Sequence, residues 1–311
     1  FYINEFEKIN FFKFLVTITF VAVLIESYGV LSSVFKYFIV DANSFERSNL
    51  LTGFSGNINV VSFSLAIKLP ILIYLFFKIK NKLYLGIILV SLLSLSSVIF
   101  ILLSRGAFLA YIFVLFTLLM YKMYESSIIN YKKTIAVIMT VVISYVFTNN
   151  IISNSESDVI LDRVESIVDV KDSSIDNRLR YYKAAFTSIR ANPIFGVGLG
   201  NWKFISIKLD YDDMVDYIIP LYVHNDLLHI AAEIGVIGAL SYLMIFIFCL
   251  YYLIKNIRSK NNIFESITLL AVLAVYFVDS MLNFPVARPI SHIFIIFVLI
   301  AISDIKKSYN D

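Results

Sequence analysis

The chain has 311 residues, of which 59% are hydrophobic and 16% charged, and its mean hydropathy is +0.82. These values exclude a soluble globular domain and predict a protein embedded in a lipid bilayer. A net charge of +3 gives no indication of nucleic-acid binding, and a single cysteine, Cys249, excludes an internal disulfide and a cysteine-built zinc site. Because the sequence begins at Phe1 rather than Met, we expect the protein to continue upstream.

Long apolar stretches recur along the chain, and a membrane-spanning helix needs about 20 mostly apolar residues. Eight stretches meet that requirement: 11–34, 57–78, 83–103, 106–121, 134–150, 227–254, 266–284 and 289–304. Only Ser104-Arg105-Gly106 separates the third stretch from the fourth, which predicts a tight helical hairpin with Arg105 at its tip. The expected fold is therefore an all-α polytopic membrane protein with about eight visible transmembrane helices.

Basic residues gather in four of the connections between these stretches. They are Lys78, Lys80 and Lys82; Lys122, Lys132 and Lys133; Lys255, Arg258 and Lys260; and Lys306 and Lys307. With eight spans all four fall on one side, which the positive-inside rule identifies as the cytoplasm. We therefore divide the chain into N-terminal membrane helices (1–150), a large extracytoplasmic loop (151–226) and C-terminal membrane helices (227–311).

The loop 151–226 is too long for a simple connector, and loops of such length are usually functional. Two faces of one helix are visible in it: Leu179, Tyr182, Phe186 and Ile189 on one, and Arg180, Lys183, Thr187 and Arg190 on the other. This periodicity predicts an amphipathic helix on the membrane surface, which begins at Asp176 or Asn177 and ends at Asn192-Pro193.

Four short motifs follow one another in and after this loop. They are Arg178-Leu179-Arg180-Tyr181-Tyr182, Asn192-Pro193-Ile194-Phe195-Gly196-Val197-Gly198, His224-Asn225, and Glu233-Ile234-Gly235-Val236-Ile237-Gly238. Together they resemble the outer-loop pattern of the O-antigen ligase and polymerase family, over roughly residues 50–250. Ser104-Arg105-Gly106-Ala107 matches a further family element, and Gly56-Asn57-Ile58-Asn59 is a weaker echo. One departure is Tyr182, where many relatives have Trp.

The resemblance implies a glycosyltransferase that uses lipid-linked glycans and no cofactor. It would move a glycan from undecaprenyl diphosphate to a lipid A core, on the outer face of the bacterial inner membrane. A polysaccharide polymerase that uses the same donor and a glycan acceptor is an alternative. The implied partners are the donor, the acceptor and membrane lipids, without metal or nucleic acid. The implied catalytic residues are His224, Arg105 and Arg178.

The residue types agree with such chemistry. Transfer from a diphosphate needs a cationic cradle for the leaving group and a base for the incoming hydroxyl. Guanidinium groups bind phosphate oxygens in pairs and stay charged, which suits Arg105, Arg178 and Arg180, with Arg178 favoured by its spacing to the next aromatic residue. The alternative is that these arginines only contact lipid headgroups.

His224 precedes a predicted spanning helix that Asn225 or Asp226 would cap. The positive end of that helix disfavours imidazolium and keeps the ring neutral, as a base must be. A lone histidine at a helix start is more often a surface residue, and only the family resemblance reverses that preference. We also expect Asn225 and Glu233 to contact substrate. His229 and Glu233 are four residues apart, and we expect a buried hydrogen bond between them rather than a metal site.

Three further charged features remain. Lys68 falls inside a span next to Pro70, where a charge costs about 2.5–3.5 kcal/mol, so we expect it to face the bundle interior. Its possible partners are Glu26, Asp279 or the diphosphate of the lipid carrier. Arg288 is a spare candidate for the cationic cradle. The acidic residues are Asp210, Asp212, Asp213 and Asp216. We interpret these as a solvated loop, with a divalent-cation site as the alternative.

Buried charges within spans would also suit a polytopic transporter. Against that reading, the sequence shows no inverted repeat of interrupted helices. Its candidate functional charges also concentrate in one outer loop rather than at the membrane midplane. The sequence alone thus favours an enzyme over a transporter.

Overall fold

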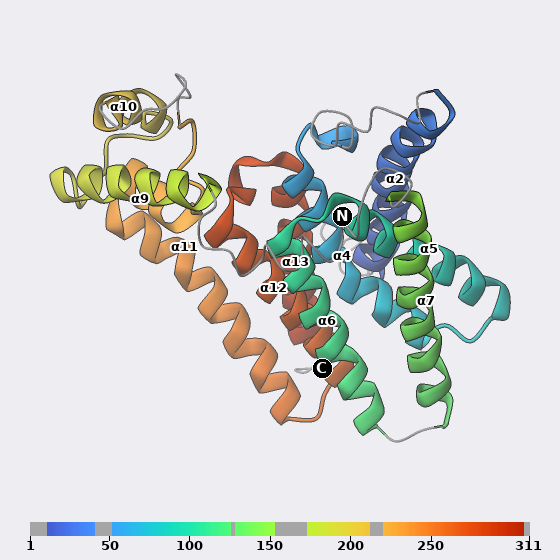
Figure 1. Cartoon of the computed structure of the whole chain (residues 1–311). Helices are drawn as coiled ribbons and strands as arrows, with labels where there is room; N and C mark the ends of the chain where they lie inside the picture. The colour runs from blue at the N-terminus through green and yellow to red at the C-terminus, as the bar shows by residue number, and fades with distance from the viewer. Residues whose placement is uncertain (1–10, 41–51, 126–127, 153–172, 212–219, 308–311) are drawn as a thin grey trace, which may run out of the picture. The chain divides into compact units, whose positions relative to one another are not determined.

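The computed structural model describes residues 11–40, 52–125, 128–152, 173–211 and 220–307. Its elements, in chain order, are α2 (Phe11–Val40), η1 (Gly53–Ser55), α4 (Ile58–Lys78), α5 (Lys82–Leu102), α6 (Arg105–Tyr124), α7 (Ile128–Ile152), α9 (Ser173–Ala191), α10 (Trp202–Leu209), α11 (Asp226–Arg258), α12 (Ile263–Leu282), η4 (Pro285–Ala287) and α13 (Pro289–Lys307). These described parts contain helices and no strand (Figure 1). The predicted all-α fold is confirmed.

Seven of the described helices are long and apolar enough to cross a membrane. They correspond to the first seven predicted spans and make the protein a multi-pass membrane protein. The eighth predicted span, 289–304, is also helical and forms most of α13. However, its apolar stretch, Pro289–Ile305, is shorter than the other seven.

The chain divides into two compact units. Unit 1 comprises Phe1–Ile167, Leu253–Val275 and Phe294–Asp311, and unit 2 comprises Val168–Tyr252 and Tyr276–Ile293. Both units interleave segments that are distant in the sequence, whereas the predicted division at 150 and 226 follows chain order. That three-part division stays a prediction.

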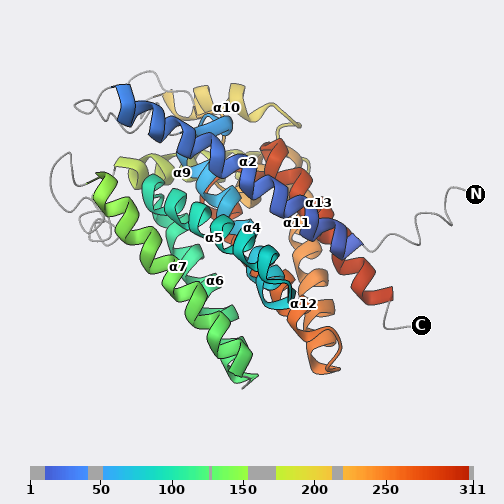
Figure 2. The ribbon, with the colours of Figure 1, turned by 90° about the vertical axis from the view of Figure 1, so that its right-hand side faces the viewer.

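In unit 1 the helices α4, α5, α6 and α7 lie side by side, as two perpendicular views show (Figures 1 and 2). Helix α4 is buried without interruption from Val61 to Ile73, so its surroundings are protein on every side over that stretch. Side-chain amides start two of these helices: Asn57 caps α4 and Asn81 caps α5.

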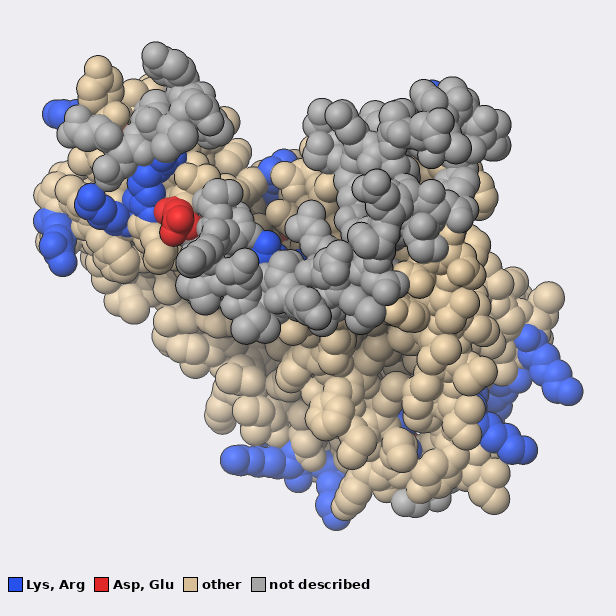
Figure 3. All heavy atoms as spheres, viewed as in Figure 1, with Lys and Arg blue, Asp and Glu red and all other residues tan. Residues whose placement is uncertain are grey.

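The basic connections of unit 1 gather at one end. Figures 1 and 2 show the α6–α7 and α11–α12 connections at the lower end and the α4–α5 connection above them in the lower half, and Figure 3 shows Lys and Arg side chains at the lower edge and on the lower right-hand side. Lys133, from α7, binds the end of α4 there: its ammonium donates to the carbonyl oxygens of Phe76, Phe77 and Ile79 at 2.8–2.9 Å. A cation at a helix C-terminus satisfies carbonyl groups that lack helical donors. Which side of a membrane this end faces stays a prediction.

Unit 2 is built around Trp202, which is fully buried. Its indole N–H donates to the Pro220 carbonyl at 2.9 Å. The surrounding core comprises Ala184, Ala185, Val223 and Ala232, with Tyr182, Ile189, Leu209 and Leu228 packed against it. This core joins α9, α10 and the first turns of α11 into one body.

The predicted amphipathic helix is confirmed as α9, and it ends at Ala191 just before Asn192-Pro193, as predicted. Its start was predicted too late, because the helix already begins at Ser173 and Asp176 lies within its first turn. The face that packs against protein is not the apolar face that the sequence predicted to lie on the membrane surface. Tyr181, Ala184, Ala185 and Ser188 are buried, whereas Leu179 and Phe186 are 59% and 50% exposed. Contact of these exposed side chains with a membrane stays a prediction.

Candidate functional site

Two motifs form one substructure in unit 2: the turn of residues 192–200, called here the glycine turn, and the α11 segment around Gly235. Gly235 has φ 80° and ψ 175°, which interrupts the helix and leaves carbonyl groups of the preceding turn without helical donors. Three backbone hydrogen bonds join the two: Val197 N–H to the Ala232 carbonyl at 2.9 Å, Gly198 N–H to the Glu233 carbonyl at 2.8 Å, and Val236 N–H to the Pro193 carbonyl at 2.8 Å. The glycine turn thus supplies the missing donors.

Glycine is required on both sides of this junction. A Cβ atom on Gly235 would overlap the Ile194 carbonyl, and one on Gly196 would overlap the Glu233 carbonyl. Both glycines also have positive φ, 80° and 64°. The two motifs recognised separately in the sequence are therefore the two halves of one backbone contact.

Glu233 supports this junction with its side chain and is 6% exposed. Its Oε1 accepts the Trp202 N–H at 3.1 Å, at the start of α10. Its Oε2 lies 3.7 Å from His229 Nε2, a distance that fits an ion pair but is too long for a hydrogen bond, so the predicted hydrogen bond is wrong. Among the described residues no group of three or more His, Cys, Asp and Glu side chains could hold a metal ion. Substrate binding by Glu233 stays a prediction.

His224 lies in the connection before α11, with φ 59°, a left-handed conformation that His adopts more readily than most residues. Aromatic rings enclose its imidazole: Tyr181 stacks at 6.0 Å between centroids, and Phe284 meets it edge-on at 4.9 Å. The next residue, Asn225, accepts the Leu228 N–H at 3.0 Å and so caps α11, as predicted. These contacts fix the orientation of the imidazole.

Two arginines lie near His224. Burial, together with the positive charges of Arg178 and Arg288, lowers the pKa of His224 from 6.5 to about 4, so the ring is neutral at pH 7. The predicted neutrality is confirmed, but its main cause is burial rather than the helix end. The His224 Nδ1 atom is buried and forms no hydrogen bond with any described residue. A neutral imidazole whose Nδ1 has no hydrogen-bond partner among the described residues therefore lies near two cations.

Arg288 was only a spare candidate in the sequence, because nothing there places it beside His224. Its guanidinium lies over the Phe284 ring, 4.4 Å from the centroid. Asp226 anchors the α12–α13 connection, which carries Phe284 and Arg288. Its Oδ2 accepts hydrogen bonds from the Val286 N–H at 3.2 Å and from the Tyr242 hydroxyl at 3.4 Å. The sequence indicated Asp226 as a helix cap only.

Arg180 is paired with a buried carboxylate. Its Nε lies 3.0 Å from Asp210 Oδ1, and Asp210 is 1% exposed. The interpretation of Asp210 as part of a solvated loop is therefore wrong, because its carboxylate is buried against a guanidinium. The other acidic residues of that run, 212, 213 and 216, lie outside the described residues. Substrate binding by Arg180 stays a prediction.

Arg105 belongs to unit 1 and is the first residue of α6. The tight hairpin is confirmed, although the connection consists of Leu103 and Ser104 rather than the Arg105 tripeptide. The Ser104 hydroxyl donates to Asn59 Oδ1 at 2.8 Å. The hairpin and the weaker motif at residues 56–59 are thus in contact within unit 1, and the catalytic role of Arg105 stays a prediction.

Lys68 also lies in unit 1, buried to 2% exposure. Of its predicted partners Glu26 is confirmed, with the ammonium 2.8 Å and 3.1 Å from its two carboxylate oxygens. The ammonium also donates to the Ser64 carbonyl at 2.9 Å. These contacts supply Lys68 with protein acceptors, and its contact with a substrate diphosphate stays a prediction.

These helices and this histidine site define a multi-pass membrane protein with a polar site attached to its spans. Residues 87–243, just over half of the chain, match the O-antigen ligase family. The chain belongs to that family. The match includes Arg105, Arg178 and His224, whereas Lys68 and Arg288 lie outside it.

Two Rickettsia proteins, whose names propose them as polysaccharide ligases, resemble part of the chain. The Rickettsia conorii protein is 31% identical over 119 residues, which are 36% of this chain and 27% of that protein. The Rickettsia felis protein is 32% identical over 99 residues, 30% of this chain and 22% of that protein. The matched stretch thus spans about a quarter of each relative's length.

Proposed function

We propose that the protein is a glycosyltransferase of the ligase type, which transfers a glycan from undecaprenyl diphosphate to a lipid A core. The reaction takes place on the outer face of the bacterial inner membrane. One observation carries the proposal: the buried, neutral imidazole of His224, whose Nδ1 has no hydrogen-bond partner among the described residues, lies near the cationic side chains of Arg178 and Arg288. Family membership supports it.

The proposed step is one displacement at the anomeric carbon of the donor. The acceptor hydroxyl oxygen forms a bond to that carbon while the bond from the carbon to the diphosphate oxygen breaks. His224 takes the hydroxyl proton, and the leaving diphosphate keeps the electron pair. Arg178 and Arg288 stabilise the charge that develops on the leaving oxygens, because guanidinium groups donate two parallel hydrogen bonds to phosphate. The reaction needs no further reactant.

Donor binding would also prepare the base. The two arginines lower the pKa of His224 in the free protein, and a base with a pKa of about 4 is weak at neutral pH. A bound diphosphate offsets their positive charge, so the pKa of His224 rises toward its ordinary value once the donor is in place. The proton acceptor is then strongest when both substrates are present.

The test is transfer by the purified protein with lipid-linked glycan and lipid A core. His224→Ala should lower turnover about 10²–10⁴-fold, the range for loss of a general base. His292→Ala is the matched control, because His292 is exposed on α13. Arg178→Lys should also be impaired because the paired hydrogen bonds are lost, whereas Arg190→Lys, exposed on α9, should not. Unimpaired transfer by His224→Ala would contradict the mechanism.

Gene deletion separates ligase from polymerase. A ligase acts last, so its loss should leave polymer on the lipid carrier and a lipid A core without repeat units. A polymerase acts earlier, so its loss should leave the core capped with a single unit. A gel of the surface glycolipid distinguishes the two, and single-unit capping would show that the enzyme is a polymerase.

A further inference from the structure

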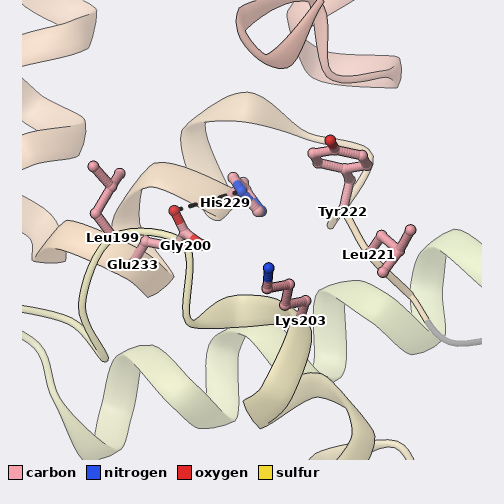
Figure 4. A pocket seen from close by; sticks show the side chains of 7 residues that line it. All are labelled: Leu199, Gly200, Lys203, Leu221, Tyr222, His229 and Glu233. Carbon is pink, nitrogen blue, oxygen red and sulfur yellow. Dashed lines mark ion pairs between the residues drawn. The ribbon is translucent and has the colours of Figure 1, made fainter.

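A cavity in unit 2 has no role in the mechanism above. It is a cavity of about 480 Å³ lined by Leu199, Gly200, Lys203, Leu221, Tyr222, His229 and Glu233, called here the side pocket. Its volume lies within the range of ligand-binding cavities, about 300–1,000 Å³. Figure 4 shows Lys203 on α10 with its ammonium directed toward the space between His229, Tyr222 and Leu221.

The polar groups of the side pocket are held in place by the junction already described. The Glu233 carboxylate is fixed by the Trp202 N–H and is 6% exposed. His229 packs edge-on against Trp202, 6.3 Å between centroids, and its buried Nδ1 forms no hydrogen bond with any described residue. A preformed acceptor and an imidazole without a hydrogen-bond partner are suited to the hydroxyl groups of a sugar.

The positive charge of the side pocket comes from Lys203. This residue forms no ion pair with a carboxylate within the described parts of the chain, and its ammonium lies over the ring of Phe204, 5.1 Å from the centroid. A lysine directed into a pocket and not paired with any described carboxylate is suited to an anionic substituent on the ligand. Leu199 and Leu221 add apolar walls, 80% and 56% exposed.

The side pocket adjoins the histidine site through one pair of rings. Tyr222 lines the pocket and stacks on Phe284, with 4.3 Å between centroids and 9° between planes. Phe284 in turn meets His224 edge-on at 4.9 Å. A ligand in the pocket is therefore separated from the proposed base by one aromatic wall, a separation that suits a sugar attached to the reacting unit.

We propose that the side pocket is a carbohydrate subsite that holds a phosphate-bearing sugar beside the reaction centre. Lys203 binds the phosphate, and Glu233 and His229 bind the sugar hydroxyls. The inference rests on the proposed function. The phosphorylated sugar belongs either to the acceptor core or to the donor glycan, which present the same chemistry to the pocket.

Binding can be measured without turnover, because Trp202 is the single tryptophan of the chain and lies against His229. The probe is phosphorylated core oligosaccharide released from lipopolysaccharide by mild acid, titrated while tryptophan fluorescence is recorded. The same material after phosphatase treatment should bind about tenfold or more weakly, as expected for loss of a charge-assisted hydrogen bond. Lys203→Gln should weaken binding of the phosphorylated probe to the same extent, and Lys203→Arg should retain most of it.

The matched control is Lys208→Gln, because Lys208 is exposed on the same helix and does not line the pocket. Equal binding of both probes, or equal binding by wild type and Lys203→Gln, would overturn the proposal. Displacement of the probe by short-chain phosphatidylglycerol would identify a lipid-headgroup site instead.

Kinetics identify the source of the sugar. Lys203→Gln should raise KM about tenfold for the substrate that carries the phosphorylated sugar, acceptor or donor, with little change in kcat. His224→Ala should still bind the probe, since the base is not part of the pocket. Probe binding without any transfer by wild type would contradict the proposed function and leave the subsite standing, so the two can fail separately.

Discussion

At the scale of single residues, His224 combines an aromatic enclosure with two nearby cations. Both influences favour the neutral ring, and burial is the larger. A lowered pKa keeps His224 unprotonated but makes it a weak base, so His224 can act as a base only if substrate binding raises its pKa again. The anionic donor would do so because it neutralises the arginines, and the acid–base balance of the site therefore depends on the substrate itself.

This dependence predicts the pH profile of an arginine variant. Arg288→Gln removes one positive charge near His224, so the imidazolium is less disfavoured and the pKa rises from about 4 toward 6.5. A base must be unprotonated, so the acid limb of kcat/KM should move to higher pH, measured from pH 4 to 8. Arg190→Gln, exposed on α9, is the control. An unmoved limb, or one displaced to lower pH, would show that Arg288 does not act on the base.

The sequence predicted the residue types of this site better than their partners. His224 and Arg178 were proposed from the resemblance to the O-antigen ligase family, with which their chemistry agrees, and their catalytic roles stay predictions. Arg288 and Phe284 reach His224 from a connection some sixty residues further along, a proximity that no local pattern encodes. Likewise, only the folded unit shows that Arg180 is paired with Asp210 at 3.0 Å. The spacing of residues along the sequence does not predict such contacts between distant segments.

At the scale of elements, the close contact between the glycine turn and α11 predicts that one added methyl group, in Gly235→Ala, strongly destabilises the protein. Gly235→Ala would place a Cβ atom on the Ile194 carbonyl at a φ of 80°, so the turn must separate from α11 and its hydrogen bonds are lost. Several lost bonds at about 1 kcal/mol each add to the strain. We expect a clear fall in the midpoint of thermal unfolding in detergent, together with loss of transfer.

Gly86→Ala is the control for this variant. Gly86 lies inside α5, and a Cβ atom there would meet no atom within 4 Å. Alanine at a helical position is neutral or stabilising by about 0.5–1 kcal/mol. Equal midpoints for the two variants would contradict the account of the junction.

The helices themselves were largely predictable because hydrophobic stretches of about 20 residues must form spans in a bilayer. Helix ends were less so. The start of α9 was predicted too late because Asp176 and Asn177 are typical capping residues, whereas Asp176 lies inside the first turn of a helix that begins at Ser173. The large apolar side chains of α9 were predicted to lie on the membrane surface, and the sequence did not indicate that Ala184 and Ala185 would pack around Trp202. Alanine contributes little to a hydrophobic pattern in the sequence, but its small side chain allows a helix to pack closely against its neighbours.

At the scale of the whole molecule, the spans of unit 1 enclose a buried ion pair, Lys68–Glu26. Lys68→Met alone leaves Glu26 without its cation, and breaking a buried pair costs about 3–5 kcal/mol. The double variant Lys68→Met with Glu26→Leu removes both charges and should recover most of the lost stability. The midpoint of thermal unfolding in detergent measures the stability of the single and the double variant. A double variant no more stable than the single one would show that the pair contributes through more than charge neutralisation.

The orientation of the molecule is the last prediction, and it follows from charge alone. Three basic connections gather at one end of unit 1, and positively charged connections are retained in the cytoplasm during insertion. Thr187, exposed on α9 in the large loop, should then face outward, whereas Ser259, exposed in the α11–α12 connection, should face the cytoplasm. After Cys249→Ala, Thr187→Cys should react with an impermeant thiol reagent in intact spheroplasts, and Ser259→Cys only after lysis. The reverse labelling pattern would place the histidine site in the cytoplasm, where a glycan donor that faces outward could not reach it.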